Sequence, residues 1–286
     1  MSEKTDALVL RLVEWSETSL IVTLLTRDFG KTSAVAKGAR RPKSSFEGAL
    51  DLLAVCRVVI IPKSGDTLDL LTEAKLERRF RAGSRDLGRL YAGYYVAELL
   101  RELTDNHDPS PELYDLAVEM LANLNGDMDV RACLLRFELQ MLRLLGHAPS
   151  LESCSGCGVP LVMPLAAGGQ VMEGRIAGSE LAGSKLAGQN SGGAVGWGTK
   201  KTQVAFGLES GGILCANCRP TARGVVVIDA ASRDWMVSSM RPQTEQDQML
   251  ELPPTSYGEI RGLLNRFIAE LCGGSLRLPP YLAGMR

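Results

Sequence analysis

Four of the seven cysteines stand in two CxxC pairs, Cys154 with Cys157 and Cys215 with Cys218. Two thiolates at this spacing can face one ion, and four together match the ligand set of a tetrahedral zinc site. Four sulfur ligands close the coordination shell, so such a site stabilises a fold and does not catalyse a reaction. The pairs lie 57 residues apart, and 24 remain once a 33-residue glycine-rich stretch is left out. We therefore predict one structural zinc ion.

Two other interpretations of the CxxC pairs stay open, a redox pair and a site without metal. A redox CxxC usually opens a helix in a βαβ setting, which neither pair has. The odd cysteine count, with no visible secretory signal, argues against a disulfide framework. The three isolated cysteines have apolar neighbours and are predicted to be small core residues: Cys56, Cys133 and Cys272.

A basic cluster in the N-terminal region is typical of a surface that binds a phosphate backbone. Six basic residues and one acidic residue fall within 17 positions: Arg27, Lys31, Lys37, Arg40, Arg41 and Lys43, with Asp28. Phe29 and Phe46 flank the cluster and could stack on bases. The alternative is a solvated charged loop with both phenylalanines in the core. A second basic group, at Arg78, Arg79, Arg81 and Arg85, either extends the surface or solvates the start of a helix.

The charge balance and the lack of catalytic motifs point to binding. The net charge of −1 divides into +4 over residues 1–85, −6 over 86–150 and +1 over 151–286. The two histidines lie in no HExxH or triad-like context, and no Walker A sequence occurs. We predict that the protein is not an enzyme. No apolar run reaches the length of a membrane span, so we expect a cytoplasmic protein.

Residues 5–76 read as five short strands, at about 6–14, 19–26, 31–37, 54–61 and 67–76. A segment this short with five strands predicts a small closed barrel. The OB-fold is the commonest such barrel that binds oligonucleotides, and an SH3-like barrel fits the strand count nearly as well.

From Leu87 the hydrophobic period becomes helical. Helices are predicted from 87 to 103, from the Ser110-Pro111 cap to 123, and at 130–145, 232–240 and 257–271, with a short strand at 224–229. Residues 166–198 contain ten glycines and are predicted to be a mobile linker or insertion. The fold class is thus α+β, with a five-stranded OB-fold barrel, a central helical bundle domain and a four-cysteine zinc-binding element.

The chain resembles the RecO family of bacterial recombination mediators. The resemblance rests on TDALVLRLVEWSETSLIVTLLTRDFGKTSAVAKGARRPKS, on LLRFELQMLRLLGHAPSLESCSGCG, on GLESGGILCANC and on the closing IRGLLNRFIAELCGGSLRLPPYL. These segments cover nearly the whole chain except about 166–200, where the glycine-rich stretch departs from the family pattern. The predicted domains are 1–80 (OB-fold), 81–150 (first helical part), 151–228 (zinc element with the insertion) and 229–286 (second helical part).

The resemblance implies a DNA repair and recombination function in the RecF pathway. It implies binding of single- and double-stranded DNA, annealing of complementary strands, and partnership with RecR and with the tail of the single-stranded-DNA-binding protein, so that RecA can be loaded. Such a protein would be cytoplasmic and associated with the nucleoid. The partner's acidic tail needs a basic or apolar patch, for which Arg131, Arg136 and Arg143 are candidates.

Two other function classes compete with this interpretation. One is a zinc-ribbon scaffold whose barrel binds protein and not DNA. The other is a thiol-dependent enzyme that uses one CxxC pair. The basic residues Arg40, Arg41 and Lys43 distinguish the first alternative, because only a DNA-binding barrel should lose oligonucleotide affinity when they are removed.

Overall fold

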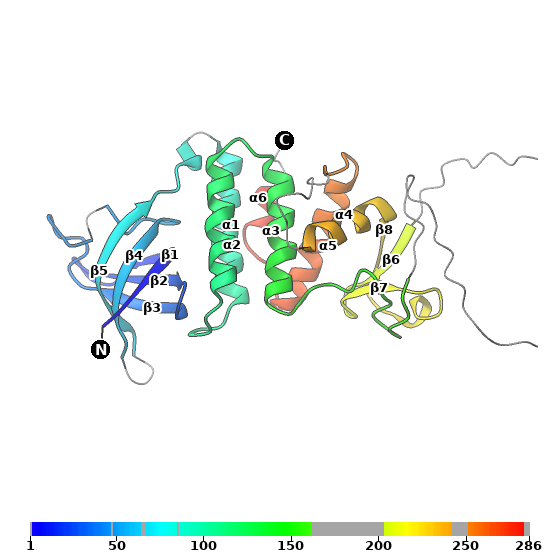
Figure 1. Cartoon of the computed structure of the whole chain (residues 1–286), viewed down its shortest axis with the longest axis horizontal. Coiled ribbons are helices and arrows are strands. Elements are labelled where there is room, and N and C mark those ends of the chain that lie inside the picture. The colour runs from blue at the N-terminus through cyan, green and yellow to red at the C-terminus, as the bar shows by residue number, and fades with distance from the viewer. Residues whose placement is uncertain are drawn as a thin grey trace, which may run out of the picture.

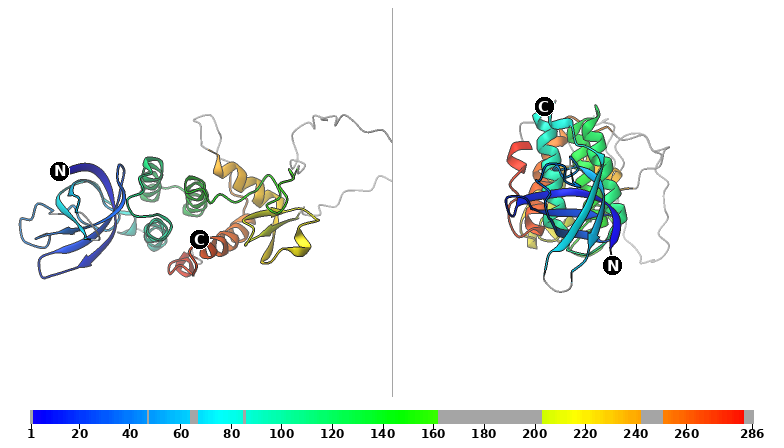
Figure 2. Two further views of the ribbon diagram at one scale, coloured as in Figure 1. Left: turned by 90° about the horizontal axis from the view of Figure 1, so that it is seen from below. Right: turned by 90° about the vertical axis from the view of Figure 1, so that its left-hand side faces the viewer.

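Three parts follow one another along the long axis of the molecule: a barrel, a set of helices and a small sheet that carries the cysteines (Figure 1). The left view in Figure 2 shows the same order, with the barrel at one end, and the right view looks onto the barrel end. The computed structural model describes residues 2–46, 48–63, 67–84, 86–161, 203–241 and 251–282. The glycine-rich stretch predicted at 166–198 lies outside the described residues. Within the described ranges, no helix has the length and apolar character to cross a membrane.

The N-terminal strands close into a barrel in the order β1-β2-β3-β5-β4. Their bounds are β1 Glu3–Glu14, β2 Leu20–Thr26, β3 Gly30–Ala36, β4 Val55–Ile61 and β5 Asp69–Arg78. Closure needs one parallel pair, β3 with β5, while the other neighbours run antiparallel. This is the five-stranded OB-fold arrangement, so the OB-fold prediction is confirmed.

A β-bulge in β1 gives the barrel two different outer surfaces. Ala7 and Val9 point into the barrel core, and the register shifts between Val9 and Arg11. Leu8 and Leu10 therefore face outward, where they join the same buried cluster as the helices. Beyond the bulge, Arg11 and the following outward residues of β1 face solvent.

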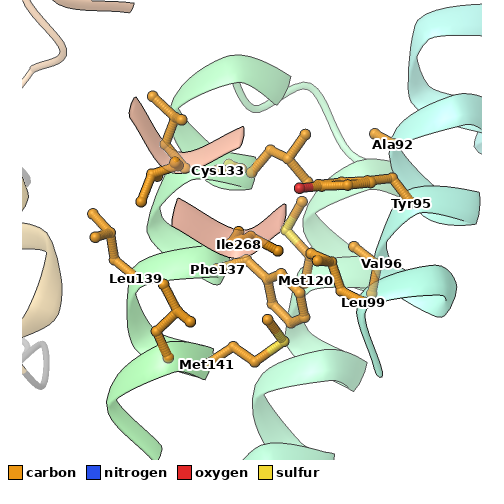
Figure 3. Close-up of a cluster of buried hydrophobic side chains, with 14 of the residues drawn as sticks. Ala92, Tyr95, Val96, Leu99, Met120, Cys133, Phe137, Leu139, Met141 and Ile268 are labelled. Atoms are coloured by element: carbon orange, nitrogen blue, oxygen red, sulfur yellow. The ribbon is translucent and has the colours of Figure 1, made fainter. Parts of the chain in front are cut away.

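The helical part is built on α1 (Leu87–Leu103), α2 (Pro111–Asn125), α3 (Val130–Leu144) and α5 (Ser256–Leu271). Side chains of Asp86, Ser110 and Asp129 accept hydrogen bonds from backbone N–H groups at the starts of α1, α2 and α3, which fixes where these helices begin. Figure 3 shows Tyr95, Met120, Phe137 and Ile268 meeting between these helices. The predicted packing of the closing helix on the helical body is confirmed.

The remaining elements surround the cysteines and close the chain. A three-stranded antiparallel sheet has the order β7-β6-β8. The elements are β6 Gln203–Gly207, β7 Gly212–Leu214, β8 Val225–Asp229, α4 Ala230–Met240 and α6 Pro279–Leu282, with short turns η1 Ala82–Ser84 and η2 Arg219–Thr221. The strands β6 and β7 were not predicted from the sequence.

The barrel is joined tightly to the helices at the turn before β3. Gly30 has φ of +70°, and a Cβ there would lie 2.3 Å from the carbonyl oxygen of Asp108. The backbone N–H of His107 donates to the carbonyl oxygen of Lys31 at 2.9 Å. Only glycine allows this close approach, so the predicted turn at Asp28-Phe29-Gly30 also serves as a docking point.

Candidate functional site

The four cysteines of the two CxxC pairs come together, as predicted. Their sulfur atoms all lie within 4.8 Å of one another, and the Sγ atoms of Cys157 and Cys215 are 3.8 Å apart. Tetrahedral zinc with Zn–S bonds of about 2.3 Å separates its sulfur ligands by about 3.8 Å. Among the described residues, this is the one His/Cys/Asp/Glu cluster with such geometry. The cluster therefore fits a single structural metal ion.

Two glycines shape the first CxxC turn. Gly158 has φ of +74°, and its N–H donates to the carbonyl oxygen of Cys154 at 2.8 Å. A Cβ on Gly156 would lie 3.1 Å from the Cβ and Sγ of Cys218, so the small residue lets the two turns approach. The turn is tied to the sheet, because the N–H of Ser155 donates to the carbonyl oxygen of Ile213 at 2.8 Å.

The electrostatics of the cluster favour a bound cation. The N–H of Cys215 donates to the sulfur of Cys154 at 3.3 Å and lowers the pKa of Cys154 to about 6. Hydrogen bonding to Cys215 and the other thiols raises the pKa of Cys218 to about 12. One thiolate thus forms readily, whereas a second is opposed by its neighbours. A divalent cation removes this opposition by neutralising the sulfur charge.

Two of the six predicted basic residues make contacts between the barrel and the helices. The guanidinium of Arg27 donates to both carboxylate oxygens of Asp115 on α2, at 3.0 and 2.9 Å. The ammonium of Lys31 donates to the carbonyl oxygens of Arg101, at 2.6 Å, and Thr104 at the end of α1. Burial lowers the pKa of Lys31. Both residues therefore help to dock the barrel.

The other four residues of the basic cluster are exposed at the end of β3. Lys37, Arg40, Arg41 and Lys43 form what we call the basic loop, residues 37–43. The loop is anchored to the β1–β2 turn, since the N–H of Arg40 donates to the carbonyl oxygen of Thr18 at 3.0 Å. Arg40 also pairs with Glu14 at 3.1 Å. Among the described residues, Lys37, Arg41 and Lys43 make no ion pair.

The second basic group lines a pocket at the junction of barrel and helices. Arg78, Arg79 and Arg81 surround it together with Asn125 from the end of α2. Arg79 donates to the carbonyl oxygen of Gly48 at 2.8 Å, so it holds the far end of the segment that begins at the basic loop. Arg85 lies outside the described residues.

One part of the base-stacking prediction is wrong. Phe46 is 4% exposed and belongs to the barrel core, so it is not available to stack on a base. Phe29 is half-buried at the turn before β3. A different aromatic residue is exposed beside the basic loop: Trp15, at 64%. Its exposure is not visible in the sequence, because a tryptophan next to an apolar strand can be either buried or exposed.

Comparisons with known proteins agree with this architecture. Residues 1–80 match the family described as Recombination protein O N terminal, and residues 84–180 match Recombination protein O C terminal. A DNA repair protein RecO of Rhodopirellula baltica is 39% identical over 298 residues, covering 96% of this chain and 97% of that protein. A DNA repair protein RecO of Myxococcus xanthus is 33% identical over 278 residues, covering 97% and 96%.

These matches cover both the barrel and the helices, and relatives of this similarity share nearly the full length of the chain. The resemblance noted in the sequence is thereby confirmed, together with a role in DNA repair and recombination. The chain belongs to the RecO family of DNA repair proteins.

Proposed function

We propose that this protein binds single- and double-stranded DNA through its barrel, anneals complementary strands and helps to load RecA onto DNA coated by the single-stranded-DNA-binding protein. The observation that carries the proposal is the exposed basic loop on the end of an OB-fold barrel. OB-folds bind oligonucleotides on the face of β2 and β3 and on the β1–β2 and β4–β5 loops. The basic loop follows β3 and is tied to the β1–β2 turn by the hydrogen bond from Arg40 to Thr18, so it borders this surface. The protein acts by binding, without a catalytic residue, on DNA in the bacterial cytoplasm and nucleoid.

The phosphate contacts are assigned chiefly to Lys37, Arg40, Arg41 and Lys43. Three of them have no acidic partner among the described residues, so their charge is available to a phosphate backbone. Arg78 and Arg79 form a second, smaller basic surface where the barrel meets the helices. Arg27 and Lys31 contribute indirectly, because they hold the barrel in place. Binding by point charges is insensitive to sequence and weakens with salt, as a mediator that must release DNA requires.

The metal proposed for the four-cysteine cluster is zinc. The donor set of four thiolates suits zinc, and no ligand position is left open for water. The ion would hold two turns that lie far apart in the sequence and so stabilise the sheet formed by β6, β7 and β8. The separation of Cys157 from Cys215 does not prevent this geometry.

A pocket between α2 and α3 is proposed as the site for the acidic tail of the single-stranded-DNA-binding protein. Met120 and Phe137 give it an apolar floor, while Arg136 supplies a cation and Glu119 a single acid. Arg136 is held over the ring of Trp235 at 5.4 Å, which fixes its direction. Arg131 instead pairs with Asp129. We expect Arg136→Gln to weaken binding of an acidic peptide and Arg143→Gln, at an exposed site, to leave it unchanged.

Strand annealing tests the proposed function. Complementary oligonucleotides coated with the single-stranded-DNA-binding protein should anneal faster when this protein and RecR are added. The triple variant R40A/R41A/K43A should lose this acceleration, while R219A/R223A, which removes two exposed arginines beside the metal cluster, should keep it. If the wild-type protein binds RecR but neither binds nor anneals DNA, the scaffold alternative is correct and the proposal is wrong.

A further inference from the structure

Three strands of the barrel share a half-exposed apolar row on their outer face. In the register of the sheet, Val13 on β1 pairs with Ile21 on β2, and Ile21 pairs with Val35 on β3. The side chains facing inward on these strands fill the barrel core, so these three point outward. Val13 is 37% exposed, and Ile21 and Val35 are half-buried.

Trp15 continues this outer row and is held by a short, tight turn. It follows the last residue of β1, two positions after Val13, so the alternation of the strand places it on the same side of the sheet, and it is 64% exposed. Its N–H donates to the carbonyl oxygen of Ser19 at 3.1 Å, and the N–H of Ser19 donates to the side chain of Ser16 at 3.2 Å. The indole therefore projects from a fixed backbone at low cost in conformational freedom.

Positive charge borders this row. Arg11 is exposed on the outward side of β1, and Lys37 is exposed directly after the end of β3. Arg40 is tied to the turn that carries Trp15, through the contact with Thr18 and the ion pair with Glu14. Glu14 and Glu17 are also exposed here, and Glu14 pairs with Arg40, so Arg11 and Lys37 leave a small excess of positive charge around the tryptophan.

We propose that this outer face holds the unpaired bases of single-stranded DNA, with Trp15 as the ring on which a base stacks. The proposal deepens the proposed function and rests on it. A base can stack on the indole ring and pack against the row of β-branched side chains beside it. The basic residues at the border of the row can pair with the phosphates that link the bases. This charge pattern argues for a polyanion as occupant and against a second copy of the chain, whose corresponding face carries the same charges.

The arrangement lets one barrel treat two forms of DNA differently. A duplex keeps its bases stacked inside, so Trp15 has no base face to contact there. The phosphates of both forms are accessible to the basic loop. Trp15 therefore adds affinity for single strands alone, while Lys37, Arg40, Arg41 and Lys43 contribute to both.

Paired binding measurements test this inference. The affinity of Trp15→Ala for a labelled oligothymidylate should fall about 5- to 150-fold, the range that one stacked base contributes. Its affinity for a duplex of the same length should stay at the wild-type value, and Trp15→Phe should recover most of the single-strand affinity. Leu87→Ala removes another exposed apolar side chain, at the start of α1, and should change neither affinity.

Tryptophan fluorescence gives a second readout. In a Trp197→Phe background the remaining tryptophans are Trp15 and the fully buried Trp235, so quenching of the red-shifted emission by oligothymidylate reports on Trp15. Unchanged single-strand affinity of Trp15→Ala, an equal loss for both DNA forms, or a change in its oligomeric state would overturn the inference and leave DNA binding intact. A wild-type protein that binds neither form would overturn the proposed function as well.

Discussion

The guanidinium of Arg27, which follows β2, makes two hydrogen bonds to the carboxylate of Asp115 on α2, at 3.0 and 2.9 Å. The two residues are 88 positions apart and join the barrel to the helical part. Together with Lys31 of β3, whose ammonium group donates to a carbonyl oxygen at the end of α1, this pair holds the barrel at a fixed place relative to the helices. The predicted basic cluster therefore divides into two parts. Arg27 and Lys31 contact the helices, whereas the residues of the basic loop are exposed to solvent.

Removing either partner of this pair should loosen the barrel without removing a DNA contact. We expect Arg27→Ala and Asp115→Ala to lower the melting temperature slightly and by similar amounts, and the double variant to lose little more, because both single variants remove the same interaction. The exchanged pair R27D/D115R should recover part of the loss. Fully additive losses in differential scanning calorimetry would contradict this coupling.

The pair of Arg27 and Asp115 also predicts how the stability of the protein depends on pH. The hydrogen bonds from Arg27 lower the pKa of Asp115 below its usual value. A carboxylate whose pKa is depressed in the folded state contributes its stability above the unfolded pKa, about 3.9, and loses it as the pH falls through the folded value. The free energies of unfolding of the wild type and of Asp115→Asn should therefore differ at neutral pH and become equal once the pH falls below the folded pKa of Asp115. A difference that persists at the lowest pH would argue against this cause.

Breaking a buried ion pair should lower the stability of the protein more than breaking the exposed pair of Arg27 and Asp115. Arg261 on α5 donates to Glu138 on α3 at 2.7 Å and to the hydroxyl of Tyr95 at 3.3 Å, and both charged side chains are buried. Glu138→Ala leaves an uncompensated buried charge and should cost about 3–5 kcal/mol of stability. The double variant E138L/R261M removes both charges and should be distinctly more stable than Glu138→Ala in urea unfolding. Equal stability of the two variants would contradict this account.

Gly30 offers a test of the close contact between barrel and helices. Gly30→Ala places a Cβ against the backbone of Asp108 at a positive φ, so it should destabilise the protein by more than about 1 kcal/mol. Gly262 lies inside α5, where an added Cβ meets nothing within 4 Å. Gly262→Ala should therefore stabilise by up to about 1 kcal/mol. Thermal melting of the two variants tests both predictions. A melting temperature of Gly30→Ala equal to that of the wild type would contradict the close contact with Asp108.

The four-cysteine cluster is predicted to hold one zinc ion and to depend on that ion for its local structure. The purified protein should contain one zinc per chain, and Cys157→Ser should lose most of it, while Cys272→Ser, away from the cluster, should retain it. Loss of zinc should expose the region of β6, β7 and β8 to proteolysis and leave the barrel folded. Wild-type protein that contains no bound metal, or full zinc content in Cys157→Ser, would show that the cluster is not a zinc site.

Local patterns predicted most of the elements. The five strands and the helices α1 to α5 begin and end within a few residues of their predicted positions, because alternation, helical period and capping residues such as Ser110 act locally. The short helix α6 was not predicted, nor were β6 and β7, which are five and three residues long and are joined through glycine-rich sequence. Their pairing depends on contacts with β8 and with the cysteine turns, which the sequence pattern does not contain.

The candidate site was only partly predictable for the same reason. Residue types identified the four cysteines and the basic cluster, since ligand spacing and charge are visible in the sequence. The partners of Arg27 and Lys31, the burial of Phe46 and the exposure of Trp15 all depend on how the barrel meets other segments. The buried pair of Glu138 and Arg261 gives no periodic signal at all.

Fluorescence anisotropy with labelled single-stranded DNA across a salt series tests the central claim most directly. For the wild type, the logarithm of the affinity should fall linearly with the logarithm of the salt concentration. The variant R40A/R41A/K43A should bind more weakly, and its slope should be shallower by about 2, because three phosphate contacts are lost. R219A/R223A should match the wild type. Unchanged affinity and slope in the triple variant would contradict the claim that the basic loop of the barrel binds DNA.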